Sequence, residues 1–382
     1  MPNTAPPASS AYPFSPAQCP RLVVKIGSAL LVDAGGAIRR EWLAGVVADV
    51  AERVRSGQQV AIVSSGAIAL GARRLGLAKG GRASLEDAQA AAATGQIGLS
   101  QAWAELLHAR GLTAAQMLVT LDDLEDRRRY LNASATLGRL LGLGVVPVIN
   151  ENDSVATEEI RFGDNDRLAA RIGQAAGAAG VILLSDVDGL YTANPARDAG
   201  AVFVPRVETI DARIRAMADD GSGSGMGSGG MVSKLAAAQI ATAGGAHLAI
   251  VSGTRAHPLA AFAADGRGTW FVAGKAGRGR KTWLAGRLTA RGRITVDAGA
   301  AAALRQGSSL LAAGATAVDG GFARGDVIEI VGAAGVAIAR GLSEYDAADA
   351  ALIAGHRSEA QAALLGYAPR VAMVHRDHLV LL

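Results

Sequence analysis

Cysteine, aromatic residues and long apolar runs are scarce in this sequence, and each shortage excludes a class of protein. The 382 residues include one cysteine, Cys19, so an intrachain disulfide framework and a cysteine-based metal site are both excluded. Aromatic residues make up 4% of the chain, which is few for a surface that stacks on nucleic acid bases. No apolar run reaches the length that spans a membrane, and no signal peptide opens the chain. We therefore expect a cytoplasmic protein with no membrane segment.

The charge is also nearly balanced. The formal net charge is +4, too little for the chain as a whole to indicate nucleic acid binding. Hydrophobic residues make up 50% and charged residues 19%, which is typical of a globular protein with a full core. The length predicts two domains, or three. Residues 1–20 hold six of the 11 prolines, and we expect them to form a disordered extension.

Short apolar runs alternate with helical patterns from residue 21 onward. The run RLVVKIGS at 21–28 predicts a buried strand and a tight turn, and the strand ending in Ser64 is followed by Ser65-Gly66 and a helix. Further strands are predicted at 114–119, 145–149, 181–184 and 247–251. Alternation of this kind predicts an α/β fold with a parallel sheet covered on both faces. Ligands bind such sheets beyond the carboxyl ends of the strands.

A glycine- and serine-rich stretch at 221–234 ends in Ser233-Lys234 and leads directly into a helical pattern. Glycine lets backbone N–H groups approach an anion, and the helix that follows adds the positive end of its dipole. A flexible linker is an equally simple explanation of the composition. The spacing of Gly225, Gly227 and Gly230 matches GxGxxG, but no strand precedes it, so it is a weak dinucleotide signal.

Acidic residues and asparagines follow two of the predicted strands. Asn150 to Asp153 come after one strand, Ser185 to Gly189 after another, and Phe162 to Asp166 lie between them. Turn formation alone explains any one of these segments, because turns favour Asn, Asp and Gly. Together with two glycine-rich loops and two lysines at element ends, they favour a binding site.

Two lysines beside glycine-rich loops indicate phosphoryl transfer, whose catalysis consists mostly of positioning and charge neutralisation. Lys25 and Lys234 would flank the β- and γ-phosphates, and Asp166 would hold both ammonium groups. The six histidines lie outside the glycine and aspartate clusters, which argues against a histidine base. An acceptor carboxylate needs none, because at a pKa of ~4.3 it is already ionised. The residues alone also allow a sugar, an amine or Mg²⁺ as the ligand.

A boundary is predicted at 265–290, which is rich in glycine and charge. Residues 275–293 contain seven basic side chains and no acidic one. We assign 21–274 to a catalytic domain, 275–290 to a basic linker and 291–382 to a small, mostly β domain, because short strands and glycine turns alternate from residue 291.

These motifs resemble the glutamate 5-kinase family of the amino acid kinase superfamily, with a C-terminal PUA domain. The resemblance extends from about residue 21 to the C-terminus. Its motifs in the catalytic part are VVKIGS at 23–28, SSGAIALG at 64–71, PVINENDSVATEEIRFGDND at 147–166, SDVDGLYTANP at 185–195 and GSGGMVSK at 227–234. GRITVDAGA at 292–300, GSSLL at 307–311 and VAMVHRDHL at 371–379 resemble the appended domain.

The resemblance implies the amino acid kinase fold, a three-layer sandwich with a mainly parallel central sheet. It implies ATP-dependent phosphorylation of the γ-carboxylate of L-glutamate, the first step of proline biosynthesis, with Mg²⁺, feedback inhibition by proline and a homo-oligomer. The catalytic residues that it implies are Lys25, Lys234 and Asp166. The implied glutamate site comprises Ser65, Asp153, Asn165, Asn150 and Asp164. The implied nucleotide site comprises Lys25, Ser185, Asp186, Ser228, Gly229, Gly230, Met231, Val232, Ser233 and Lys234. No metal ligands are assigned.

Two other functions are compatible with the sequence. Another amino acid kinase, acting on aspartate, acetylglutamate, carbamate or a nucleotide, would carry similar loops, but the INEND and GDND segments favour glutamate. An RNA-binding protein would use the appended domain and the basic run, although a solvated linker explains that run more simply. Specific RNA affinity at physiological salt would favour the second alternative.

Overall fold

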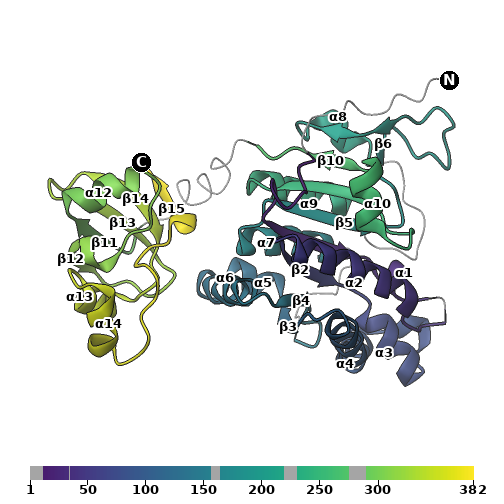
Figure 1. Ribbon diagram of the computed structural model, residues 1–382, viewed down its shortest axis with the longest axis horizontal. Coiled ribbons are helices and arrows are strands. Elements are labelled where there is room, and N and C mark those ends of the chain that lie inside the picture. Colours follow the sequence, from purple (N-terminus) through teal and green to yellow (C-terminus); the bar gives the residue numbers. More distant parts are fainter. Residues whose placement is uncertain (1–11, 34, 156–163, 219–229, 275–289) are drawn as a thin grey trace. The chain divides into compact units, whose positions relative to one another are not determined.

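The computed structural model describes residues 12–33, 35–155, 164–218, 230–274 and 290–382, and it divides into two compact units (Figure 1). The first comprises Met1–Leu124 and Ala133–Ala276, and the second comprises Glu125–Asn132 and Gly277–Leu382. The predicted linker at 275–290 lies almost entirely outside the described residues.

The chain up to residue 271 forms the elements of an α/β domain. They are β1 (Arg21–Ile26), α1 (Ser28–Leu31), α2 (Arg40–Arg55), β2 (Gln59–Ser64), α3 (Ala67–Leu75), η1 (Ala78–Gly81), α4 (Leu85–His108), β3 (Ala114–Val119), α5 (Leu121–Glu125), α6 (Arg127–Gly142), β4 (Val146–Glu151), α7 (Asp164–Ala176), β5 (Gly180–Ser185), β6 (Leu190–Tyr191), β7 (Phe203–Val204), β8 (Arg206–Val207), α8 (Ala212–Ala216), α9 (Met231–Ala243), β9 (His247–Ser252), α10 (Pro258–Asp265) and β10 (Thr269–Phe271).

Eight strands form one sheet in the order β3-β4-β2-β1-β5-β9-β10-β8. Neighbouring strands run parallel, except that β10 is antiparallel to β9. The chain passes from β1 to β2 and β4 on one side and then crosses back to β5 on the other side of β1. The predicted α/β fold with a mainly parallel sheet is confirmed, and this reversal marks the edge where such sheets bind ligands.

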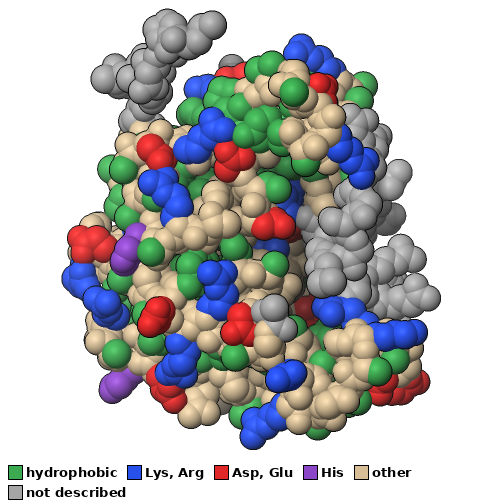
Figure 2. Space-filling view, turned by 90° about the vertical axis from the view of Figure 1, so that its right-hand side faces the viewer, with side chains coloured by type: hydrophobic (Ala, Val, Ile, Leu, Met, Phe, Trp, Pro, Cys, Tyr) green, Lys and Arg blue, Asp and Glu red, His purple; other side chains and the backbone are tan. Residues whose placement is uncertain are grey.

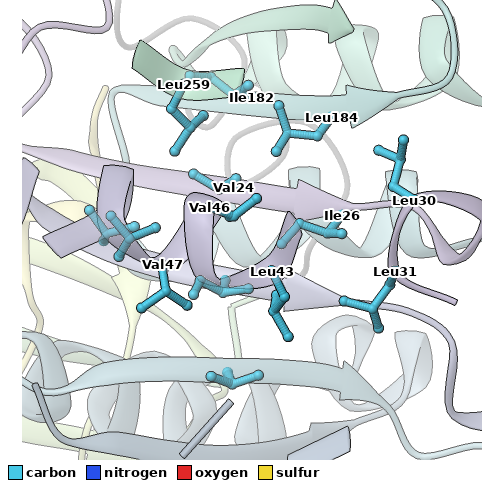
Figure 3. Packing of buried hydrophobic residues seen from close by; sticks show 14 of the residues in the cluster. Val24, Ile26, Leu30, Leu31, Leu43, Val46, Val47, Ile182, Leu184 and Leu259 are labelled. Atoms are coloured by element: carbon cyan, nitrogen blue, oxygen red, sulfur yellow. The ribbon is translucent and has the colours of Figure 1, made fainter. Parts of the chain in front are cut away.

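Alternation along β1 separates its apolar side chains from its lysine. Leu22, Val24 and Ile26 point toward α2 and share a buried cluster with it, and Figure 3 shows Val24 and Ile26 facing Val46 and Leu43. Helices α4 and α10 contribute to the same cluster. Successive side chains of a strand point to opposite faces, so Lys25 must lie on the other face, which α7 and α9 cover. The apolar pattern of one strand thus places a buried lysine beside two helices.

The segment before β1 is ordered from residue 12, so the prediction of a disordered extension through residue 20 is wrong for its last part. Phe14 and Cys19 are fully buried in the core, and a Cβ on Gly180 would lie 2.8 Å from the Phe14 ring. Arg53 Nη1 donates to the Phe14 carbonyl at 3.0 Å. The proline content of this segment indicated disorder. The burial of Phe14 against Gly180 nevertheless holds the segment in the core. Residues 1–11 lie outside the described residues.

The glycine- and charge-rich stretch that starts at residue 265 begins inside the catalytic domain, which we assign to 21–274. Residues Thr269–Phe271 form β10 inside the catalytic sheet, and Thr269 and Phe271 are both fully buried. Thr269 Oγ1 accepts from the backbone N–H of Leu190 at 2.7 Å and donates to the Val204 carbonyl at 2.6 Å. A strand of three residues is too short to give an alternating pattern, so the surrounding glycine and charge concealed it.

The second unit contains a five-stranded sheet in the order β12-β11-β13-β14-β15, with a buried cluster around Ile294, Ile330 and Tyr345. Its elements are β11 (Gly292–Val296), α12 (Ala298–Arg305), η2 (Ala312–Gly314), β12 (Ala315–Gly320), β13 (Val327–Gly332), β14 (Ala337–Leu342), α13 (Ala347–Ile353), α14 (Ser358–Leu365), η3 (Arg376–His378) and β15 (Leu379–Leu381). The expected mostly β C-terminal domain is therefore present.

Candidate active site

Four neighbouring strands end at one edge of the catalytic sheet, and the predicted site residues lie there. β1 and β2 are in register, so that Lys25 pairs with Val63 and Ile26 with Ser64. β5 ends at Ser185, and β4 carries Asn150 near its end. The carboxyl ends of parallel strands open on the same crevice, so residues from distant parts of the sequence meet here.

Lys25, Asp166 and Lys234 form one buried cluster. Lys25 Nζ lies 2.5 Å from Asp166 Oδ1, and Lys234 Nζ lies 3.3 Å from Asp166 Oδ2. The Asp166 side chain is 0% exposed, and the two lysine side chains are 9% and 7% exposed. The three residues come from β1, the first turn of α7 and the first turn of α9. The structure therefore brings together all three residues expected to be catalytic.

The charges of this cluster do not cancel. Two ammonium groups meet one carboxylate, which leaves a formal charge of +1 on the three side chains. A buried charge is costly unless it is compensated, because the surroundings solvate it less well than water. The positive charge of these three side chains would attract an anion, and a polyphosphate carries the required sign.

A second cluster of amides and hydroxyls includes three of the residues expected to bind glutamate. Asn165 Nδ2 donates to Ser65 Oγ at 2.6 Å and lies 3.3 Å from Asn150 Oδ1. Ser65 precedes Gly66, which begins α3 with a φ of 106°, a left-handed conformation that favours glycine. The turn after β2 thus directs the Ser65 hydroxyl toward the first turn of α7.

Asp153 is buried two residues beyond β4. Burial raises the pKa of its carboxyl to about 6, and the positive charge of Arg82 opposes part of that rise. A cationic ligand would stabilise the ionised form of this carboxylate, because its charge replaces the stabilisation that water gives to an exposed carboxylate. Asp164 begins α7, but its side chain lies outside the described residues, so its predicted role remains a prediction.

The expected nucleotide residues are described in part. Ser185 is buried, and its hydroxyl donates to Asp186 Oδ1 at 3.0 Å, while its carbonyl accepts from the Gly253 N–H at 2.7 Å. Helix α9 begins at Met231 after Gly230, which offers no side-chain cap to the first turn. Val232 is exposed, and Ser233 is half-buried. Ser228 and Gly229 lie outside the described residues.

Sequence reasoning missed three side chains that contact or influence the site from the α3–α4 region. Gln96 Oε1 accepts from Asn150 Nδ2 at 2.8 Å, and Trp103 Nε1 donates to Ser64 Oγ at 3.0 Å. Arg82 follows η1 and acts electrostatically on Asp153. Gln96 and Trp103 are seven residues apart in α4, about two helical turns, and thus lie on one face. Their spacing places both on one face of α4, but the sequence does not show what that face contacts, so it gave no signal for Gln96.

Charged side chains are mixed elsewhere on the surface. Figure 2 shows Lys and Arg interspersed with Asp and Glu over the face that it presents. Within the described ranges, no group of three or more His, Cys, Asp and Glu side chains is arranged to hold a metal ion. No helix in those ranges is long and apolar enough to cross a membrane.

Comparison with known proteins places this geometry in a family. The sequence model of the amino acid kinase family matches residues 20–252, and that of the PUA domain matches residues 292–364. The glutamate 5-kinase of Sphingopyxis alaskensis is 73% identical over 97% of this chain and 99% of its own length. That of Zymomonas mobilis is 62% identical over 97% of this chain and 93% of its own length.

Among solved structures, the UMP kinase of Bacillus anthracis aligns with 67% of this chain and 96% of its own, at 14% identity and a TM-score of 0.47. The T. acidophilum isopentenyl phosphate kinase aligns with 66% of this chain and 99% of its own, at 16% identity and a TM-score of 0.46. The family matches and the near full-length identity to the two glutamate 5-kinases decide the assignment. The chain belongs to the amino acid kinase family and, within it, to the glutamate 5-kinases that carry a C-terminal PUA domain.

Proposed function

We propose that this protein transfers the γ-phosphoryl group of ATP to the γ-carboxylate of L-glutamate, forming L-glutamyl 5-phosphate for proline biosynthesis. The observation that carries the proposal is the buried cluster in which one carboxylate, Asp166, contacts the ammonium groups of Lys25 and Lys234. The relatives at 73% and 62% identity are named glutamate 5-kinases, which supports the choice of acceptor.

The lysine cluster acts on the phosphates. The bond between the γ-phosphorus and the bridging oxygen of ATP breaks during phosphoryl transfer, so negative charge builds up on the β-phosphate of the leaving ADP, while the transferred group also carries negative charge on its three outer oxygens. Lys25 and Lys234 neutralise that charge, and Asp166 holds their ammonium groups in place before the substrate arrives. Preorganised donors of this kind each contribute on the order of 10²–10³ to kcat. Ser185, Asp186 and the start of α9 hold the remainder of the nucleotide.

The amide cluster and Asp153 act on the amino acid. Asp153 attracts the α-ammonium group, and Ser65 and Asn165 orient the substrate beside the lysines, with Asn150 supporting Asn165. The γ-carboxylate is the nucleophile and is ionised at neutral pH, so no side chain needs to remove a proton from it. This division explains why the site combines lysines with amides and has no histidine among the residues described at its edge.

Mg²⁺ fits the site as a companion of ATP. The Asp166 carboxylate is engaged by two lysines, and Mg²⁺ commonly retains waters and binds through substrate phosphates rather than a cage of protein ligands. When bound, the ion would neutralise phosphate charge. Asp186, an exposed carboxylate beside Ser185, would be available to it.

Feedback inhibition by proline and assembly into a homo-oligomer are proposals that rest on the family alone. RNA binding by the C-terminal domain is a weaker alternative, because a solvated linker explains the basic run more simply and aromatic residues make up only 4% of the chain. Another acceptor acid is the closer alternative, since the lysine cluster would serve any carboxyl or phosphate acceptor equally well.

The deciding experiment measures ATP turnover with Mg²⁺ and hydroxylamine, which traps an acyl phosphate as a hydroxamate. The acceptors are L-glutamate, L-aspartate, N-acetylglutamate and UMP, each with and without proline. Hydroxamate with glutamate alone supports the proposal. Hydroxamate with another acid would retain the lysine cluster and reject the glutamate assignment of Asp153 and Asn165. No turnover with any acceptor would reject the proposed function and favour a filter-binding test for RNA.

A further inference from the structure

Asn165 carries a buried acceptor that the described residues do not use. Its Nδ2 donates to Ser65 Oγ and lies near Asn150 Oδ1, whereas its Oδ1 is buried and has no hydrogen-bond partner among the described residues. A buried unsatisfied oxygen is costly and awaits a donor. Of the charged groups of glutamate at neutral pH, only the α-ammonium donates hydrogen bonds, because both carboxylates are ionised.

The orientation of Asn165 follows from a series of hydrogen bonds that begins at a backbone group. The Glu151 N–H can only donate, and it donates to Asn150 Oδ1 at 2.9 Å. The other end of the Asn150 amide is therefore Nδ2, which donates to Gln96 Oε1 at 2.8 Å. Asn150 Oδ1 also faces Asn165 Nδ2, so the remaining atom of Asn165 must be its acceptor oxygen.

The side chain of Gln96, at the far end of this series of hydrogen bonds, is itself held by a further hydrogen bond. Its Nε2 donates to Ser100 Oγ at 3.1 Å, one turn further along α4. Asn150 is 3% exposed, so loss of the Gln96 acceptor would leave its Nδ2 buried without this partner. Asn150 would then rotate to find another partner, and Asn165 would lose the oxygen that fixes its own amide.

We propose that Gln96 is a positioning residue that acts through Asn150 to hold Asn165 Oδ1 as an acceptor for the α-ammonium group of the amino acid substrate. The proposal rests on the proposed function, because it assumes that the substrate is an α-amino acid. Asp153, three residues beyond Asn150, supplies the negative charge for the same group. Gln96 thus contributes to the selection of an amino acid over a plain dicarboxylic acid.

The test compares Gln96→Met with Gln101→Met. Methionine has a similar volume and removes the amide. Gln101 lies on the same helix and makes a similar bond, Nε2 to Glu105 Oε1 at 2.8 Å, but that bond is exposed and outside the series. The substrates are L-glutamate and glutarate, which keeps the reacting carboxylate and lacks the ammonium group. The measurements are hydroxamate kinetics, the KM for ATP and the thermal midpoint.

We expect Gln96→Met to lower kcat/KM for glutamate about 10-fold, mostly through KM, and to leave kcat/KM for glutarate and the KM for ATP within about 2-fold. Gln101→Met should match the wild type. Equal losses with glutamate and glutarate, or a raised KM for ATP, would mean that Gln96 merely supports the fold and would overturn the proposal. An unchanged preference for glutamate would overturn it as well.

A double-mutant cycle isolates the route through Asn165. If Gln96 acts through Asn165, then adding Gln96→Met to Asn165→Ala should change kcat/KM for glutamate by less than about 2-fold. A further 10-fold loss would mean that the two residues act independently. The wild-type protein tests the proposed function separately from the role of Gln96. If the wild type forms no glutamyl hydroxamate, the proposed function is rejected before any variant is measured.

Discussion

Replacing Asp166 with asparagine tests the charge imbalance at the centre of the site. The substitution preserves shape and removes the carboxylate that contacts Lys25 and Lys234. The formal charge of the three side chains then rises from +1 to +2. The change is made at a fully buried position, since the Asp166 side chain is 0% exposed. The two ammonium groups then repel each other without the carboxylate that joined them.

The expected cost follows from the burial of all three side chains. Removing one partner from a buried ion pair costs about 3–5 kcal/mol, because the other charge is left uncompensated. Native proteins are stable by about 5–15 kcal/mol, so Asp166→Asn should lose a large fraction of the free energy of unfolding. ATP should bind the variant at least as tightly as the wild type, since its phosphates replace the lost negative charge, while kcat falls by about 10²–10³.

Lys234→Ala is the matched comparison, because it changes the charge in the opposite direction. Lys25 and Asp166 then form a one-to-one pair with a formal charge of 0. We expect a similar fall in kcat, weaker ATP binding and a smaller loss of stability than in Asp166→Asn. Urea unfolding with and without ATP, together with hydroxamate kinetics, measures all three. If Asp166→Asn unfolds within about 1 kcal/mol of the wild type, the electrostatic account of this cluster is wrong.

Three further predictions follow from other parts of the catalytic unit. Burial raises the pKa of Asp153 to about 6, so its carboxyl becomes protonated as the pH falls through that value. The KM for glutamate should therefore rise below about pH 6 while the KM for ATP stays constant. A pH profile without this difference would contradict the role of Asp153 in binding the amino acid. Gly95→Ala should cost at least about 1–3 kcal/mol in urea unfolding, because its Cβ would lie 1.9 Å from the Ala67 carbonyl oxygen and force α3 and α4 apart; unchanged stability would refute this close approach. Phe14→Ala should cost about 3–5 kcal/mol by the same measurement, and a loss under 1 kcal/mol would mean that residues 12–20 are not part of the core.

The central strands and the lysine cluster could be predicted because each depends on a local pattern. Between Arg21 and Gly27 the run is apolar apart from Lys25, so a lysine was expected at the end of a buried strand, and the expected strand at 114–119 coincides with β3. Asp166 and Lys234 begin helices that follow polar or glycine-rich segments. A buried lysine needs a carboxylate, and few candidates were available near these ends.

The contribution of α4 could not be predicted, because its polar residues resemble those of any surface helix. Gln96 and Gln101 lie in the same stretch of sequence, and each bonds to a neighbour one turn further along. Only the position of β4 in the sheet determines that Gln96 faces Asn150 while Gln101 faces solvent. That information is tertiary, and neither composition nor helical periodicity contains it.

The first turn of α7 links the two halves of the site. Asn165 and Asp166 are consecutive, so their side chains leave the helix about 100° apart. Asp166 reaches across to the lysines of β1 and α9, while Asn165 reaches Ser65 beside β2. A shift of this turn would disturb the cations that receive the phosphates and the amide that orients the acceptor at the same time. For that reason, substitutions that loosen α7 should lower kcat and raise the KM for glutamate together, whereas Gln96→Met should act on the amino acid alone.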